Sequence, residues 1–248
     1  MLPSASSLEG QAVPKVVFKV RSEEQWADVS SDDIFRGKTV VVFALPGAFT
    51  PTCSSTHLPR YNELAATFRA NSVDEVVCMA VNDAFVLDEW QKGQEAGQIR
   101  FIPDGNGDFA AGMGLLVDKR ALGFGMRSWR YSMLVRDGVI DKIFIEPERD
   151  GDPFEVSDAD TMLRHINPQA SAPESALIFA KPGCPHCARA KAALARHGFD
   201  YTEITMSQHI NSKALRAVAG QSTWPQVFIG GKLIGNADAL DAHLADSR

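Results

Sequence analysis

The sequence predicts an α/β protein with two separate sheet-and-helix domains. Short apolar runs, typical of buried strands, alternate with stretches of helical periodicity along most of the 248 residues. A small, polar, proline-bearing stretch at residues 167–175 interrupts this alternation and has the composition of a linker. The strand-and-helix pattern then restarts and continues to the end of the chain. We therefore expect a larger domain over residues 1–166, a linker over 167–175 and a smaller domain over 176–248.

The first domain is expected to form a central sheet flanked by helices. Apolar runs predict its strands, helical spacing and N-capping residues predict its helices, and Arg136-Asp137-Gly138 is a hairpin signal between two strands. The predicted strands cover residues 15–20, 39–45, 76–81, 99–102, 131–135 and 139–145. The predicted helices cover residues 31–35, 53–70, 84–96, 109–116 and 157–166.

Cys53 follows the strand at residues 40–45, which is apolar throughout. Pro46-Gly47 ends that strand, and Pro51 suits the first turn of a helix, where its missing N–H would be unpaired anyway. Cys53 is therefore expected near a helix N-terminus, where free N–H groups and the helix dipole favour a thiolate. Thr50 could hydrogen-bond that thiolate or a substrate oxygen. The alternative is a buried, inert cysteine, but the strand–turn–helix setting favours a reactive one.

The residues around Cys53 resemble the motif of a peroxiredoxin of the atypical, type-5 kind. The match runs over P-G-A-F-T-P-T-C-S-S-T-H-L-P, residues 46–59, and over N-D-A-F-V, residues 82–86. The resemblance implies a thioredoxin-like fold with Cys53 as the peroxidatic cysteine, and with Pro46 and Thr50 shaping its pocket. We expect the whole chain to be α/β, with two thioredoxin-like domains.

The same resemblance implies an arginine, just before a later strand, that faces the thiolate and the peroxide. The matching segment is W-R-Y-S-M-L-V, residues 129–135, so this role falls on Arg130, with Arg127 as the near competitor. A guanidinium suits the role because it is permanently charged and offers several fixed donors.

The remaining cysteine of the first domain and the histidines outside the C-x-x-C motif are expected to have no catalytic part. Cys78 lies in an apolar run without a basic neighbour and is interpreted as a packing residue. The other five histidines show no pattern of partners and are predicted at the surface or at helix ends: His57, His165, His197, His209 and His243.

The second domain is predicted to have the order β-α-β-α-β-β-α. Cys184-Pro185-His186-Cys187 lies between its first strand, residues 176–180, and its first helix. In that setting C-x-x-C is a redox motif, because the first thiol starts a helix and the second can resolve it. A zinc site would need four ligands, usually as two close pairs, and no second pair is present. We therefore expect thiol chemistry at Cys184 and Cys187 and no metal.

Nearly all of residues 175–248 resemble a glutaredoxin, through Lys181, the C-x-x-C motif, T-W-P at 223–225 and G-N-A-D at 235–238. The resemblance implies a cis peptide bond before Pro225 and glutathione as the ligand. Lys181 would pair with a glutathione carboxylate, Trp224 would bind the cysteinyl part through its backbone, and Ala237 with Asp238 would hold the γ-glutamyl end. His186 replaces the usual tyrosine, and Asn236-Ala237 replace a glycine and a second small residue.

Composition limits the possible partners and the compartment. The net charge of −6 argues against nucleic-acid binding; residues 1–174 carry −9 and residues 175–248 carry +3. The apolar runs are too short to span a bilayer, and the N-terminal residues do not resemble a secretory signal. Four cysteines in a chain of this length are no disulfide framework, so we expect a reducing compartment, the cytoplasm.

These observations together predict a glutathione-dependent thiol peroxidase that reduces hydrogen peroxide and organic hydroperoxides. Cys53 would react with the peroxide, and the glutaredoxin domain would recycle it, with glutathione as co-substrate and no permanently bound cofactor. The family resemblance implies a homo-oligomer, either a dimer or a tetramer. Two alternatives are a peroxide sensor that passes oxidation to client proteins, and a holdase or scaffold with vestigial thiols.

Overall fold

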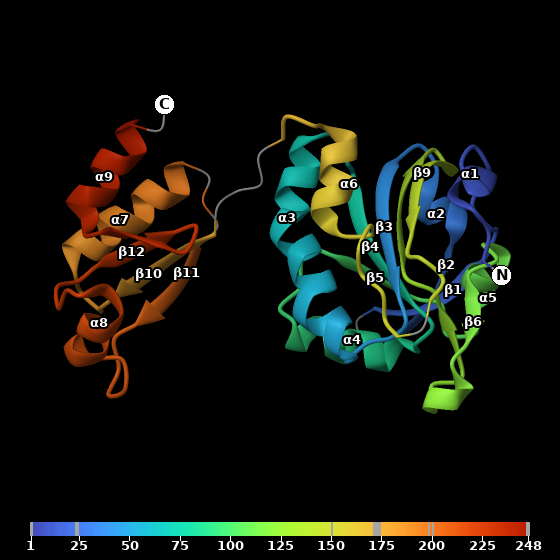
Figure 1. The fold of residues 1–248 in the computed structure, drawn as a ribbon, viewed down its shortest axis with the longest axis horizontal. Coiled ribbons are helices and arrows are strands. Elements are labelled where there is room, and N and C mark those ends of the chain that lie inside the picture. Colours follow the sequence, from blue (N-terminus) through green and yellow to red (C-terminus); the bar gives the residue numbers. More distant parts are fainter. Residues whose placement is uncertain are drawn as a thin grey trace. The chain divides into compact units, whose positions relative to one another are not determined.

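The structure, a computed structural model, describes residues 2–22, 25–149, 151–170, 175–197, 199 and 201–246 (Figure 1). The chain separates into two units, Met1–Ala170 and Ser171–Arg248, each with its own sheet and core. Residues 171–174 of the predicted linker lie outside the described residues. Within the described ranges, no helix is both long and apolar enough to cross a membrane.

A five-stranded mixed sheet forms the centre of the first unit, in the order β5-β4-β3-β8-β9. Its middle strand is β3, Thr39–Leu45, which lies parallel to β4 and antiparallel to β8. Because β3 has neighbours on both edges and helices on both faces, residues 40–45 are all buried, which explains the continuous apolar run. The other strands are β4 at Glu75–Ala80, β5 at Arg100–Pro103, β8 at Tyr131–Arg136 and β9 at Val139–Ile145.

Helices cover both faces of this sheet (Figure 1). On one face, α3 (Leu58–Ala70) packs beside α6 (Ala159–Ile166), which carries an Asp158 N-cap. On the other face, a large apolar cluster joins the sheet to α2 (Ser31–Phe35) and α5 (Asp108–Gly112) through Phe35 and Phe109. The remaining helices of the described part of this unit are α1 at Ala5–Leu8, α2 at Ser31–Phe35, α4 at Ala84–Gly93 and α5 at Asp108–Gly112, with a 3₁₀ turn at Arg120–Leu122.

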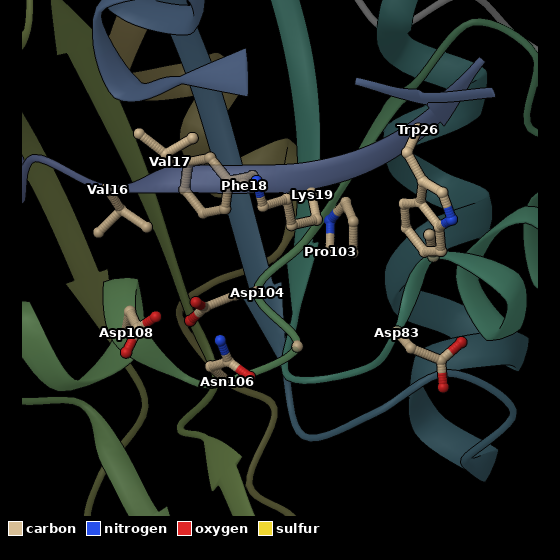
Figure 2. A pocket seen from close by; sticks show the side chains of 12 residues that line it. Val16, Val17, Phe18, Lys19, Trp26, Asp83, Pro103, Asp104, Asn106 and Asp108 are labelled. Carbon is tan, nitrogen blue, oxygen red and sulfur yellow. The ribbon is translucent and has the colours of Figure 1, made fainter. Parts of the chain in front are cut away.

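A small cavity of about 140 Å³ lies where β1, Val17–Ser22, crosses the loop after β5 (Figure 2). The loop carries Asp104, whose carboxylate accepts hydrogen bonds from the N–H groups of Phe109 and Ala110 at 3.0 and 2.9 Å. Burial raises the pKa of Asp104. Both of its oxygens are engaged in starting α5, so this side chain serves the fold.

Two small hairpins and two helix ends differ from the predictions. The strand predicted at 15–20 is β1, Val17–Ser22, and it pairs with an unpredicted strand, β2 at Gln25–Ser30. A second unpredicted hairpin joins β6 (Leu116–Asp118) to β7 (Met126–Ser128). Because β2 is mostly exposed, it lacks the apolar alternation of a half-buried strand. The helices predicted to reach residues 96 and 116 stop at Gly93 and Gly112, before the left-handed residues Glu95 and Gly114.

The second unit has a four-stranded sheet in the order β11-β10-β12-β13. The central strand β10, Ala176–Ala180, lies parallel to β11 and antiparallel to β12. Helices α7 and α9 pack against each other, whereas α8 contributes to a separate small cluster around Phe179. The predicted strand-and-helix order is confirmed by α7 at Pro185–Arg196, β11 at Tyr201–Thr205, α8 at Ser212–Ala219, β12 at Gln226–Ile229, β13 at Lys232–Gly235 and α9 at Ala237–Asp246.

Candidate active sites

The turn after β3 is held by one hydrogen bond within the turn and by one to Asn82, which lies in the loop that leads into α4. The N–H of Ala48 donates to Oδ1 of Asn82 at 3.0 Å, and the hydroxyl of Thr50 donates to the carbonyl of Gly47 at 2.9 Å. Phe49 adopts a left-handed conformation with φ of 62°, which is unusual for an aromatic residue and is typical of a constrained functional loop. Pro46 is half-buried at the start of this turn.

Cys53 lies in the first turn of the helix that begins at Pro51, and its side chain is buried (0% exposed). From Cys53 to His57 the helix is widened to a π turn, after which α3 continues in α-helical geometry. Such π turns occur frequently at functional sites. The next residue, Ser54, is fixed from outside because its hydroxyl accepts a hydrogen bond from Nε1 of Trp90 at 3.0 Å.

The structure places Arg130, rather than Arg127, beside Cys53. Nη1 of Arg130 lies 3.5 Å from Sγ of Cys53, and the arginine side chain is only 1% exposed. Arg127 donates instead to two carbonyls, from Nη1 to Val81 at 2.7 Å and from Nε to Phe124 at 2.8 Å. A buried guanidinium next to a thiol can stabilise negative charge on the sulfur and on an oxygen bound there.

Thr50 does not hydrogen-bond the sulfur of Cys53 in this structure. Its hydroxyl has one proton, and that proton is donated to the carbonyl of Gly47. The expected bond from Thr50 to the thiolate is therefore replaced by one that shapes the turn. The oxygen of Thr50 still has lone pairs with which it can accept a hydrogen bond from a substrate.

His57 belongs to this site, so its assignment to the surface or to a helix end without a partner was wrong. It is fully buried (0% exposed), with Nδ1 at 3.1 Å from Nη1 of Arg130 and Nε2 at 3.2 Å from the carbonyl of Ser157. Because Arg130 can only donate, Nδ1 accepts and Nε2 carries the proton. Burial, followed by the charge of Arg130, lowers the pKa of His57 to about 3, so the ring stays neutral at physiological pH.

A buried carboxylate fixes the carbonyl that holds His57. The side chain of Glu146 accepts hydrogen bonds from three successive backbone N–H groups, at residues 155–157, at 2.8, 2.9 and 2.8 Å. It also accepts from the hydroxyl of Ser157 at 2.7 Å. The hydroxyl of Tyr61 donates to the Ser157 carbonyl at 3.0 Å, beside the bond from His57. We call residues 152–157 the arginine strap, because this segment surrounds Arg130 and His57.

The arginine strap contacts Arg130 directly as well as through His57. The carboxylate of Asp152 forms an ion pair with Nη2 of Arg130. The ring of Phe154 lies 5.6 Å from the guanidinium carbon and 4.9 Å, between centroids, from the ring of His57. Sequence reasoning missed the strap because its residues lie about twenty positions beyond Arg130 and come to it only when β8 and β9 pair.

Cys78 is buried in β4, where it pairs with Phe43 of β3. Burial, and then the nearby charge of Cys53, raises the pKa of Cys78 well above its usual value. The side chain is therefore a neutral thiol inside the core, which agrees with its interpretation as a packing residue.

The second thiol site stands at the start of α7. Cys184 is the N-cap residue, and its sulfur accepts a hydrogen bond from the N–H of Cys187 at 3.2 Å. Burial opposes ionisation of Cys184, but hydrogen bonds from the Cys187 thiol and N–H, and then the charge of Lys181, outweigh it and lower its pKa. Burial and the bond to Cys184 raise the pKa of Cys187 to about 11. Cys184 is thus the nucleophile of the pair.

The residues assigned to glutathione lie in two places around Cys184. Lys181 lines a pocket of about 390 Å³ together with both cysteines, Lys191 and Glu203. The Trp224–Pro225 peptide bond is cis, as the resemblance implies, and the Trp224 carbonyl lies 3.9 Å from Sγ of Cys184.

The γ-glutamyl end of the predicted site contains a partner that sequence reasoning missed. Ala237 is buried at the start of α9, and the neighbouring Asp238 is exposed. The carboxylate of Asp238 forms an ion pair with Arg189 of α7 through Oδ1. Arg189 lies five residues after Cys184, in the helix that the C-x-x-C motif begins. Its short distance in sequence from the motif could have indicated a place near the thiol site.

Comparison with known proteins matches both domains. Residues 8–163 match the Redoxin family model, and residues 176–234 match the Glutaredoxin family model. The chain is 55% identical over 240 residues to the hybrid peroxiredoxin hyPrx5 of Haemophilus influenzae, covering 97% of this chain and 100% of that protein. It is 51% identical over 185 residues to a peroxiredoxin of Synechocystis sp., covering 68% of this chain and 98% of the relative.

Solved structures agree with the sequence matches. A crystal structure of reduced Prx3 from Vibrio vulnificus, in complex with H2O2, covers 64% of this chain and 98% of its own, with a TM-score of 0.60 and 39% identity. The 1-Cys peroxiredoxin called antioxidant protein of Plasmodium falciparum covers 65% of this chain and 99% of its own, with a TM-score of 0.62 and 29% identity. The chain therefore belongs to the redoxin family, as a hybrid peroxiredoxin that carries a glutaredoxin domain, and it is a peroxidase.

Proposed function

We propose that this peroxidase reduces hydrogen peroxide and organic hydroperoxides at Cys53 and is recycled by glutathione through its own glutaredoxin domain. The observation that carries the proposal is the contact of 3.5 Å between Arg130 and the Cys53 sulfur in a domain whose other thiol, Cys78, is buried and held neutral. Such a domain has no accessible resolving thiol of its own. The reductant must then come from outside the domain, and the second half of the chain carries the thiol pair Cys184 and Cys187.

In the first half-reaction, the thiolate of Cys53 attacks one oxygen of the peroxide bond. A sulfur–oxygen bond forms, the oxygen–oxygen bond breaks, and the sulfur loses two electrons. The leaving oxygen departs with the electron pair and takes up a proton, to give water or an alcohol. Arg130 stabilises the negative charge as it moves from sulfur to the leaving oxygen, since its donors are already placed in a dry site.

His57 supports this step by holding Arg130 and does not transfer the proton. Its Nε2–H is bonded to Ser157, and its Nδ1 accepts from Nη1 of Arg130. With a pKa of about 3 the ring has no additional proton to give at neutral pH. The second hydrogen on Nη1 is the one that faces the Cys53 sulfur.

In the second half-reaction, the sulfenic acid on Cys53 condenses with one glutathione and releases water, which leaves a mixed disulfide. The thiolate of Cys184 attacks the glutathione sulfur and sets Cys53 free. A second glutathione then attacks the same glutathione sulfur and releases Cys184. One hydroperoxide and two glutathiones thus give one alcohol or water, one further water and one glutathione disulfide.

A coupled assay with glutathione, glutathione reductase, NADPH and a hydroperoxide tests the proposal. Steady NADPH consumption is expected from the full chain, and none above background from Cys53→Ser. Cys53→Ser should still reduce a small mixed disulfide, because that activity depends on Cys184. Oxidation of the protein in a single turnover, with no steady consumption, would contradict the proposal and favour the peroxide sensor.

We also propose that the protein works in the reducing cytoplasm as a homo-oligomer. All four cysteines are free thiols in the structure, and recycling needs a pool of reduced glutathione. Light scattering of the purified full chain measures the oligomeric state. A monomer at cellular concentrations would contradict the second part.

A further inference from the structure

Asp152 is an acidic residue at the Cys53 site to which the proposed reaction gives no part. Its carboxylate pairs with Nη2 of Arg130, and its side chain is 40% exposed, whereas that of Arg130 is buried. We propose that Asp152 makes Cys53 select uncharged hydroperoxides over hydroperoxides that carry a negative charge. This inference rests on the proposed roles of Cys53 and Arg130, and it concerns which oxidants reach them.

The charges in contact with the guanidinium support this selectivity. In the described structure the guanidinium forms hydrogen bonds, an ion pair and a ring contact with Cys53, His57, Asp152 and Phe154. His57 is neutral because burial holds its pKa low, and Phe154 carries no charge. In the reactive form, the positive charge of Arg130 faces two negative charges, the Cys53 thiolate and the Asp152 carboxylate. The group as a whole carries one net negative charge, and Asp152 is its exposed part.

Asp152 acts from the side of the guanidinium that does not face the sulfur. Nη1 makes the contacts with Cys53 and His57, whereas Nη2 makes the contact with Asp152. The backbone of the arginine strap is held separately, by the bonds from residues 155–157 to Glu146. Replacing Asp152 by asparagine therefore removes a charge while leaving the contacts of Nη1 with Cys53 and His57, and the bonds of the strap to Glu146, in place.

The field of a half-exposed carboxylate acts on the part of an oxidant that remains outside the site. Its range is set by the Debye length, about 8 Å at physiological salt. The Asp152 carboxylate and the Cys53 sulfur contact the same guanidinium, so a negatively charged hydroperoxide that approaches Cys53 also approaches Asp152 and is repelled by it. A neutral hydroperoxide of the same shape does not experience this repulsion, so the rate ratio between the two oxidants reports the charge of Asp152.

The test compares cumene hydroperoxide with its para-carboxylate derivative, by stopped-flow measurement of Cys53 oxidation in the full chain. Both oxidants have the same reacting group and the same rigid ring, so any change in Cys53 ionisation cancels in their rate ratio. In Asp152→Asn the preference for the uncharged oxidant should fall about threefold to tenfold at low salt, for a unit charge at this kind of separation. At high salt the difference between variant and wild type should shrink, because the charge is screened.

Glu155→Gln is the matched control. It removes the same charge from the same strap, but from a carboxylate that pairs with Arg149 instead of Arg130. Its rate ratio should equal that of the wild type. An unchanged ratio in Asp152→Asn, with both oxidants still reduced, would overturn the inference and leave the proposed function standing; equal shifts in both variants would also overturn it. If wild-type Cys53 reacts with neither oxidant, the proposed function itself fails.

Discussion

The two thiol sites of this chain obtain their reactivity by different means. At Cys184 the support is local, because the residues that lower the pKa of its thiol, namely Cys187 and Lys181, lie within three positions of it. At Cys53 the charge comes from Arg130, which lies 77 positions away in sequence. Arg130 is in turn held by His57 and by the arginine strap. The comparison shows that the groups that contact a thiol at a helix start can lie within one motif or be assembled only by the completed fold.

The largest effect is expected when Arg130, the distant support of Cys53, is removed. Arg130→Met should lower the rate of Cys53 oxidation by about 100-fold to 1,000-fold, the usual cost of removing a donor that faces developing charge. Reduction of a mixed disulfide by Cys184 should not change, since it uses no residue of the first unit. Stopped-flow oxidation and the disulfide assay measure the two activities. Arg127→Met is the control, and an equal loss there would mean that the 3.5 Å contact is not the source of the effect.

The local support of Cys184 is tested by replacing the two thiols of the motif one at a time. Cys184→Ser should lose nearly all glutathione-driven peroxidase turnover, whereas Cys187→Ser should retain a large share. The reason is that resolving a glutathione mixed disulfide needs one attacking thiolate and a second glutathione, not a dithiol. The pKa of Cys184 is lowered and that of Cys187 is raised to about 11, so Cys184 should be alkylated at a lower pH than Cys187. If Cys187→Ser stalls as a disulfide between Cys53 and Cys184, seen by mass spectrometry, the dithiol route holds instead.

The same contrast explains what could be predicted from the sequence. The strand-to-helix setting of both reactive cysteines and the order of the second unit follow from local patterns, and the structure agrees with them. Arg130 could be assigned only through the family resemblance, because no local pattern links it to Cys53. Arg130 directly precedes β8, and its contact with Cys53 forms when β8 pairs with β3, the strand that leads to the Cys53 turn.

His57 shows why part of the site could not be predicted. Its place four residues after Cys53 on one helix face was visible, but its partners were not. The Ser157 carbonyl is 100 positions away and is a backbone atom, which no residue pattern marks. The hairpin of β1 and β2 was missed for a simpler reason, since exposed strands lack the apolar alternation that identifies a strand.

A smaller effect is expected when Arg130 is kept and its hydrogen-bond partner His57 is replaced. His57→Phe removes the acceptor that orients Nη1 of Arg130, so the guanidinium is held less firmly at the Cys53 sulfur, and Cys53 oxidation should slow about tenfold to 100-fold, which corresponds to about 1–3 kcal/mol of lost transition-state stabilisation. His57→Asn should recover much of the rate, because its side-chain oxygen can take the place of Nδ1. Rates and the pH profile of alkylation of Cys53 measure both variants. A purely structural role would instead lower both variants in parallel with their stability.

The buried histidine also makes stability depend on pH. His57 stays neutral in the folded state, with a pKa of about 3, while in the unfolded chain it binds a proton with its ordinary pKa of about 6.5. Below that value the unfolded state holds more protons, so stability falls as the pH drops; at pH 5 the loss from this group is about 2 kcal/mol relative to pH 7. Urea unfolding of the first unit in the full chain, followed between pH 5 and 7, measures it. His57→Phe should lose this part of the slope, and an unchanged slope would assign it to other groups.

The smallest effect is expected at Cys78, the thiol that takes part in neither site. Cys78 is buried beside Phe43, its pKa is raised, and no route for resolving Cys53 passes through it. Cys78→Ala should therefore keep the full glutathione-driven turnover and lose only about 1 kcal/mol of stability, from the small volume removed. Alanine is the better substitute here because serine would bury a hydroxyl that needs a partner. If a folded Cys78→Ala protein no longer turns over, Cys78 is a resolving thiol after all, and the Cys53 site has local redox support like that of Cys184.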